Sequence, residues 1–234
     1  MYALLVVGGE GQRLRPYTDD RPKAMVPIND RPLLEYQMEW LKANGVTHVV
    51  LLCGYRAERI QEHFQDGSHM GLSIQYSVEE TPLGRGGALK QGFGLVPPSE
   101  KVIIGANGDN LQTQPLAPML EFHHAKEAAV TVMLTQLRSP YGIATLNDDG
   151  RLTGFQEKPL LPHWLNAGVY VISSDTFSLF PDLGDHETTT FPELTRQGRL
   201  YGYKSTAYWK PVDTVKDLLE AGKEILEHPL GSSL

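Results

Sequence analysis

The sequence contains a single cysteine and no apolar run that approaches the roughly 20 residues needed to cross a bilayer. One cysteine cannot form an internal disulfide, and Cys53 lies in the apolar run VVLLC, so we expect a buried, unreactive thiol. The first seven residues are apolar, but glycine and charge follow at once, which is unlike a signal peptide. We therefore expect a cytoplasmic protein with no membrane partner.

An excess of positive charge is also missing, because 21 Lys and Arg face 28 Asp and Glu, for a formal charge of −7. This balance argues against nucleic acid as a partner, since nucleic-acid-binding proteins usually carry a basic face. The eight histidines show no metal-ligand spacing. Against this acidic background four cations gather in GGEGQRLRPYTDDRPK, residues 8–23: Arg13, Arg15, Arg21 and Lys23. The cluster favours a local anion site.

The same glycine-rich stretch lacks two common nucleotide-binding signatures. Nothing in it matches the Walker A pattern, and Leu14 stands where a dinucleotide fingerprint has its third glycine. A flexible turn and a phosphate cradle remain open. Exposed backbone N–H groups beside guanidinium charge suit a triphosphate.

Apolar runs alternate with amphipathic stretches along the first half of the chain. Strands are predicted at 2–7, 47–53, 72–78 and 101–109, and helices at 32–43, 55–65 and 85–93. This alternation predicts an α/β fold, doubly wound, with a mostly parallel mixed sheet. The second half is richer in strands, predicted at 129–137, 141–147, 151–157, 167–173 and 199–205, before a last helix at 214–226.

We interpret residues 1–227 as a single domain without internal repeats. A Rossmann-like, nucleotide-binding half covers about 1–125, a smaller β-rich, sugar-binding half covers about 126–227, and 228–234 form a short tail. In an open parallel sheet, ligands bind at the carboxyl ends of the strands. The glycine loop at 8–11, the loop TPLGRGGA at 81–88 and Asp109 all follow strands, so we expect them to converge on one crevice.

Six sequence blocks carry a resemblance to a known family. The first, GGEGQRLRPYTDDRPKAMVPI, is similar to the signature GGxGTRLRPLT…PKPMxPI of the sugar-1-phosphate nucleotidyltransferases. The others follow in the family's order and cover almost the whole chain: PLGRGGAL, NGD, FQEKP, NAGVYV and WKPVDTVKDLLEA. Such enzymes join a nucleoside triphosphate and a sugar-1-phosphate into a nucleotide-sugar and pyrophosphate. The resemblance therefore implies an active nucleotidyltransferase that uses Mg²⁺.

The resemblance also implies residue roles. Arg13, Lys23 and Asp109 would be catalytic, with Asp109 and Asp213 as metal ligands. Residues expected to bind the nucleotide are Val7, Gly8, Gly9, Gly11, Gln12, Arg13, Glu79, Pro82, Gly84, Asn107 and Gly108. Residues expected to bind the sugar phosphate are Gly142, Glu157, Lys158, Asn166 and Gly168.

The last block departs from the family pattern. Pro211 stands where many members have an aspartate, and the order W-x-P-V-D-T resembles the glucose-1-phosphate cytidylyltransferase branch, which makes Asp213 the candidate ligand. The alternative is that Asp213 only caps the last helix. Gln12 and Ala24 replace a threonine and a proline of the signature, and Val7 replaces an alanine. None of these changes removes a charge.

The base and the sugar stay open at this stage. Glu79 stands where thymidylyl and uridylyl members often carry glutamine, and a carboxylate can accept both N1–H and N2–H of guanine. This favours GTP with mannose-1-phosphate, while UTP, dTTP or CTP with glucose-1-phosphate or an amino-sugar-1-phosphate remain alternatives. A regulatory paralogue that senses nucleotide-sugars without turnover is a second class, and a glycosyltransferase a third. The sequence also leaves the oligomeric state open, and a homodimer is one expectation because it is the commonest assembly.

Overall fold

A computed structural model describes residues 1–228, so the predicted tail lies, apart from His228, outside the described residues. Its centre is a seven-stranded sheet in the order β12-β8-β11-β6-β1-β4-β5, in which β11 alone runs antiparallel to both its neighbours. The strands are β1 (Tyr2–Val6), β4 (His48–Cys53), β5 (Ser73–Val78), β6 (Val102–Asn107), β8 (Val130–Arg138), β11 (Leu160–Ser173) and β12 (Leu200–Lys204). The expected mostly parallel, mixed α/β sheet is confirmed.

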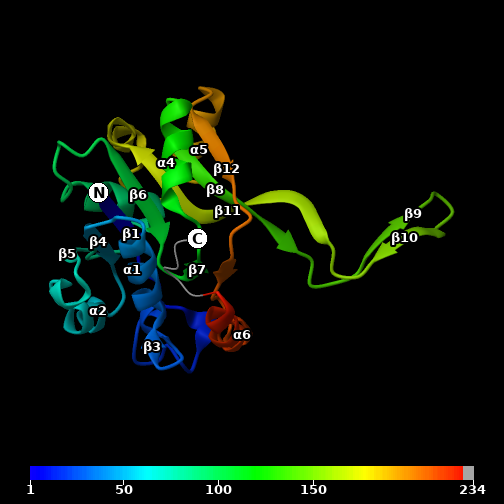
Figure 1. The fold of residues 1–234 in the computed structure, drawn as a ribbon, viewed down its shortest axis with the longest axis horizontal. Coiled ribbons are helices and arrows are strands. Elements are labelled where there is room, and N and C mark those ends of the chain that lie inside the picture. The colour runs from blue at the N-terminus through cyan, green and yellow to red at the C-terminus, as the bar shows by residue number, and fades with distance from the viewer. Residues whose placement is uncertain (229–234) are drawn as a thin grey trace.

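Helices cover both faces of this sheet (Figure 1). One face packs against α1 (Leu33–Ala43), α2 (Ala57–Phe64) and α4 (Leu116–Ala125), and the other against α3 (Gly84–Phe93) and α5 (Thr190–Arg196). The alternation of strand side chains explains this arrangement. In β1, Ala3 and Leu5 belong to the first core and Leu4 to the second, and all three are fully buried.

A third, smaller core lies beneath the last helix, α6 (Val215–Glu227). It joins Leu14 of the glycine-rich segment to Leu111, Val212 and Leu218. Two short strands, β7 (Asn110–Gln112) and β13 (Trp209–Pro211), pair antiparallel beside it, and β2 (Pro27–Ile28) pairs with β3 (Arg31–Pro32). This packing brings residues near 13, 109 and 213 together although they are far apart in the sequence.

The strands predicted at 141–147 and 151–157 form, but not in the central sheet. They are β9 (Ile143–Leu146) and β10 (Leu152–Gln156), a separate two-stranded ribbon that extends away from the body of the molecule (Figure 1). We call residues 139–159 the arm. Every residue of β9 and β10 is exposed, so these strands lack the second layer that buries the others. Within residues 1–228, no helix combines the length and the apolar character needed to cross a membrane.

Candidate active site

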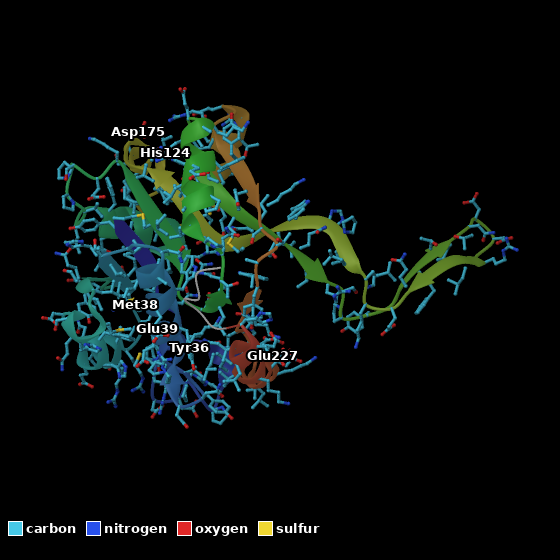
Figure 2. All side chains as sticks on the ribbon, in the orientation of Figure 1. Tyr36, Met38, Glu39, His124, Asp175 and Glu227 are labelled. Atoms are coloured by element: carbon cyan, nitrogen blue, oxygen red, sulfur yellow. The ribbon has the colours of Figure 1, made fainter. Side chains whose placement is uncertain are left out.

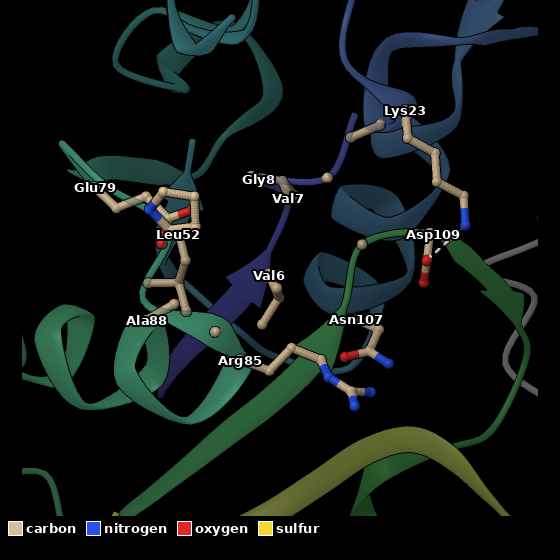
Figure 3. Close-up of a pocket in the computed structure, with 15 residues that line it drawn as sticks. Val6, Val7, Gly8, Lys23, Leu52, Glu79, Arg85, Ala88, Asn107 and Asp109 are labelled. Atoms are coloured by element: carbon tan, nitrogen blue, oxygen red, sulfur yellow. Dashed lines mark hydrogen bonds and ion pairs between the residues drawn. The ribbon is translucent and has the colours of Figure 1, made fainter. Parts of the chain in front are cut away.

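Two pockets meet at the carboxyl ends of β1 and β6, the neighbouring parallel strands of the sheet centre. Pocket A has a volume of about 320 Å³ and lies between the glycine loop and the start of α3 (Figure 3). Pocket B, of about 650 Å³, lies between the end of β6, β11 and β13. Arg85, Asn107 and Asp109 line both pockets. A ligand with two linked parts can therefore occupy both pockets at once.

Lys23 holds two carboxylates at the junction of these pockets. Its Nζ lies 2.7 Å from Asp109 Oδ2 and 2.7 Å from Asp213 Oδ1, and Arg13 reaches the same Asp213 oxygen at 3.0 Å. Lys23 is 9% exposed, whereas the Arg13 side chain is 70% exposed. The cluster thus combines one buried cation, one exposed cation and two half-buried carboxylates.

Three chain segments position this cluster. The Lys23 N–H donates to Gly9 O at 3.1 Å, which fixes the lysine beside the glycine loop. Asp109 follows β6, and the Val212 N–H donates to Asp109 O at 3.0 Å, which sets Asp213 beside it. Although burial acts to raise it, the hydrogen bond and charge of Lys23, together with Arg13, hold the pKa of Asp213 below its usual range. Asp213 is therefore an anion at neutral pH.

The helix-capping alternative for Asp213 is wrong, because Thr214 is the N-cap of α6. The Thr214 side chain accepts from the Asp217 N–H at 3.2 Å, and Asp217 in turn accepts from the Thr214 N–H at 2.8 Å, forming a capping box. The Asp213 side chain is thereby left to face the pocket.

The donor set fits a hard cation that is completed by a substrate. The two carboxylate oxygens on Lys23 are at most about 5.4 Å apart, twice the 2.7 Å that each lies from Nζ. A Mg²⁺ ion held at about 2.1 Å by each oxygen needs the two oxygens to be at most about 4.2 Å apart. Among residues 1–228, no group of three or more His, Cys, Asp and Glu could hold a metal. Two carboxylates together with phosphate oxygens are a usual environment for Mg²⁺.

The glycine loop forms one wall of pocket A through Val7, Gly8 and Gly9. Gly11 adopts φ +68°, and a Cβ there would lie 2.9 Å from the Lys23 Cβ, so only glycine fits this turn. The turn continues into a short 3-10 helix, Gln12–Leu14. Gly11, Gln12 and Arg13 lie outside the lining of pocket A, and Arg13 instead reaches the junction of the two pockets.

Glu79 also lines pocket A and lies beside the glycine loop, since a Cβ on Gly8 would lie 3.3 Å from its Oε1. Its Oε2 accepts from the Leu83 N–H at 2.8 Å, and its Oε1 lies so near Gly54 that a Cβ there would approach it to 2.5 Å. The carboxylate is therefore held in place, with lone pairs left for a ligand. Pro82, Gly84, Asn107 and Gly108 line the same pocket.

Pocket B is lined by amide, carboxylate and aromatic groups. Asn166 Oδ1 accepts from the Gly168 N–H at 2.9 Å, while its Nδ2 donates to Glu187 Oε1 at 2.7 Å. Gly168 has φ +73°, and a Cβ there would lie 2.5 Å from Asn107 Nδ2. The Trp209 indole N–H donates to Ala167 O at 2.9 Å. Such a pocket can bind a polyhydroxylated ring between hydrogen-bonding groups and an aromatic wall.

Two charged residues of this site, Arg85 and Glu187, are absent from the sequence-based predictions. Arg85 pairs with Asp185 at 3.1 Å and also with Glu187, and it faces both pockets. Arg85 lies inside the block PLGRGGAL, but the block does not indicate a role for its arginine. Glu187 lies in a segment without any motif, and no sequence signal indicates it.

Gly142, Glu157 and Lys158 are the predicted sugar-phosphate residues that the structure does not bring to pocket B. They lie in the arm, outside the lining of both pockets. They do lie close to one another, since a Cβ on Gly142 would come within 2.9 Å of Glu157 Oε2. Their predicted role therefore needs the arm to reach a pocket.

Comparisons with known proteins agree with this geometry. The family profile described as "Nucleotidyl transferase" matches residues 2–228. The mannose-1-phosphate guanylyltransferase of Mycobacterium tuberculosis is 33% identical over 232 residues, which are 96% of this chain and 64% of that protein. The D-glycero-alpha-D-manno-heptose 1-phosphate guanylyltransferase of Aneurinibacillus thermoaerophilus is 34% identical over 230 residues, which are 96% of this chain and 98% of that protein.

The chain spans 60 to 64% of the mannose-1-phosphate guanylyltransferases that it matches. Among solved structures, HddC from Yersinia pseudotuberculosis superposes with a TM-score of 0.77 at 24% identity. The match covers 96% of this chain and 99% of that one. At this identity the likeness shows a shared fold.

Proposed function

Because the chain belongs to the nucleotidyl transferase family, we propose that it transfers a guanylyl group from GTP to mannose-1-phosphate, releasing pyrophosphate. The observation that carries this proposal is the position of Lys23, Asp109 and Asp213 at the junction of two pockets. A phosphoryl-type transfer between two anionic substrates needs alignment and charge neutralisation at such a junction.

In this mechanism the nucleoside lies in pocket A and the sugar in pocket B. An oxygen of the sugar phosphate forms a bond to the α-phosphorus, and the bond from that phosphorus to the bridging oxygen of pyrophosphate breaks. The glycine-loop N–H groups and Arg13 bind the triphosphate, and Lys23 turns from its carboxylates to the phosphates that react. Asp109 and Asp213 would hold a Mg²⁺ ion, which supplies charge neutralisation when bound.

The choice of guanine rests on Glu79 in pocket A. Its carboxylate is anchored by Leu83 and can still accept from two neighbouring donors, the pattern that N1–H and N2–H of guanine present. The names of the relatives above agree with GTP as donor. Glu79→Gln should lower kcat/KM for GTP by at least tenfold and leave the rate with UTP unchanged or higher. An unchanged preference for GTP would remove Glu79 from base selection.

The choice of a manno-configured sugar rests on the relatives, which are named for mannose and for a manno-heptose. Asn166 and Glu187 offer an amide and a carboxylate to the sugar hydroxyls. The heptose has one more carbon than mannose. The assay should therefore include both mannose-1-phosphate and D-glycero-alpha-D-manno-heptose 1-phosphate. Gly142, Glu157 and Lys158 are proposed to complete the sugar-phosphate site.

The decisive assay measures pyrophosphate release with Mg²⁺, five nucleoside triphosphates and a panel of sugar-1-phosphates. GTP with a manno-configured sugar phosphate should give the highest rate. Asp109→Asn should abolish turnover without unfolding the chain, while Glu121→Gln, a matched change at an exposed position of α4, should retain the full rate. No release with any pair, together with binding of GDP-sugar, would instead favour the regulatory paralogue.

Two further proposals concern the cellular location and the oligomeric state of the protein. We propose a cytoplasmic location, because its proposed substrates include a nucleoside triphosphate and because Cys53 is a free thiol. We also propose that the protein forms a homodimer in which the arms join the two copies.

A further inference from the structure

The arm is an isolated ribbon with a large apolar surface. Figures 1 and 2 show it standing away from the body, with its side chains free of the other elements. Seven large apolar side chains of the arm and its base are 41 to 74% exposed: Leu137, Tyr141, Ile143, Leu146, Leu152, Phe155 and Leu160. A two-stranded ribbon is marginally stable by itself and normally packs on another layer. A covering surface is therefore expected.

The base of the arm is ordered and fixes its outward direction. β8 and β11 remain paired as far as Arg138 and Leu160. Beyond this pair, the Ser139 N–H donates to Pro159 O at 2.9 Å, and the Arg138 guanidinium donates to Lys158 O at 3.2 Å. These bonds hold the two sides of the arm together at the point where the arm leaves the central sheet.

In the chain alone, the cations of pocket B and of its junction with pocket A are paired with carboxylates. Lys23 is paired with two carboxylates, and Arg85 is paired with Asp185 and Glu187. Lys158, in contrast, is exposed, and within the described chain no carboxylate lies within ion-pair distance of it. The arm thus carries a cation that, unlike Arg85 and Lys23, is not held by a carboxylate in the described chain, and Glu157 is beside it.

We propose that the arm of one copy covers pocket B of a second copy and supplies Glu157 and Lys158 to it, with the second arm doing the same in return. The reason for choosing a second copy is that the arm carries residues for a pocket of this kind, which every other copy of the chain offers. This inference rests on the proposed function. A reciprocal exchange closes as a twofold dimer.

The available area agrees with such a dimer. Seven side chains that each expose on the order of 100 Å² supply about 700 Å² of mostly apolar surface per arm. A stable interface of standard size buries about 800 Å² per partner. The charge of Lys158 would serve the sugar phosphate, because the carboxylates that line pocket B are already paired: Glu187 with Arg85, and Asp109 and Asp213 with Lys23.

A complementation experiment separates arm exchange from an arm that serves its own chain. Lys158→Ala damages only the arm, and Asp109→Asn damages only the pocket. Each variant alone should lose at least about 10²-fold in pyrophosphate release. In a heterodimer isolated through two different tags, the Lys158→Ala pocket receives the intact arm of the Asp109→Asn copy. One of two sites then works, and about half of the wild-type rate returns.

The control heterodimer joins Lys216→Ala, an exposed lysine on α6, with Asp109→Asn, and it should show half of the wild-type rate in either arrangement. A Lys158→Ala/Asp109→Asn heterodimer that stays inactive beside this active control would overturn the exchange. So would a Lys158→Ala enzyme with the wild-type rate. An inactive wild-type enzyme would instead contradict the proposed function, and the measurement of mass below would still test the dimer.

The arm surface is tested by the mass of the protein in solution. Wild type should elute with twice the mass of one chain. The double change Leu146→Ser and Leu152→Ser, at facing positions of β9 and β10, should weaken dimerisation at least tenfold. Leu219→Ser, at a position of α6 with similar exposure, should leave it unchanged. A monomeric wild-type protein at micromolar concentration contradicts the proposal.

Discussion

The stability of the protein should fall between pH 7 and pH 5 because of a buried histidine near the active site. His186 is 1% exposed and lies among Phe180, Tyr170 and Phe191, with ring centroids 4.8 to 5.5 Å away. Within residues 1–228 neither of its ring nitrogens has a hydrogen-bond partner. Burial, assisted by the charge of Arg85, lowers the pKa of His186 to about 4.

The direction of this pH dependence follows from which state, folded or unfolded, binds the proton. Between pH 6.5 and pH 4 the unfolded chain protonates this imidazole and the folded chain does not, so acid favours unfolding. With a folded pKa of about 4 and an unfolded pKa of 6.5, the loss from pH 7 to pH 5 is about 2 kcal/mol. His123, whose pKa burial also lowers to about 4, adds a similar amount.

The substitution His186→Leu isolates the contribution of His186 to the loss of stability. It replaces a polar ring without a hydrogen-bond partner in the described chain by an apolar side chain of similar volume. Urea unfolding at pH 7 and pH 5, at one protein concentration, measures the free energy of unfolding. The variant should lose about 2 kcal/mol less than wild type between the two pH values. His69→Leu, at an exposed position, should keep the wild-type loss. An equal loss in wild type and His186→Leu would refute the buried neutral state of this ring.

Three further changes test the site and its supports. Arg13→Ala should lower kcat/KM on the order of 10²-fold in the pyrophosphate assay and leave stability unchanged, because the side chain is 70% exposed. Gly168→Ala should destabilise the chain by at least about 1 kcal/mol in urea unfolding, since φ is +73° and the new Cβ would press on Asn107. Thr214→Ala should cost about 1 kcal/mol in the same assay by removing the capping box with Asp217, and unchanged stability would contradict that cap.

The central sheet and the converging loops could be predicted because their signals are local. Strands buried on both faces, such as β1 and β6, are continuous apolar runs, and parallel strands place the loops that follow them at one edge. Gly11 and Lys23 belong to one short segment, residues 8–23, which could be predicted to form one local anion site. Asp109 followed from its place at the end of a strand.

The separate course of the arm could not be predicted. Residues 129–137 and 141–147 both read as strands, but β8 lies buried in the central sheet and β9 is fully exposed. Which sheet a strand joins depends on contacts distant in sequence. The same limit hid Arg85, because its partners Asp185 and Glu187 lie about a hundred residues away. The capping alternative for Asp213 could be excluded only once the structure placed the N-cap at Thr214.

The cluster around Lys23 is better explained by ligand exchange than by stability. A buried lysine between two carboxylates adds little net stability, because its desolvation offsets much of the attraction. The cluster is instead notable because its two positive and two negative charges cancel. Lys23 and Arg13 neutralise Asp109 and Asp213 in the chain alone. On the proposed function, a triphosphate draws the two cations to itself and leaves the two carboxylates free for a divalent metal, so binding of the nucleotide and of the metal should be coupled.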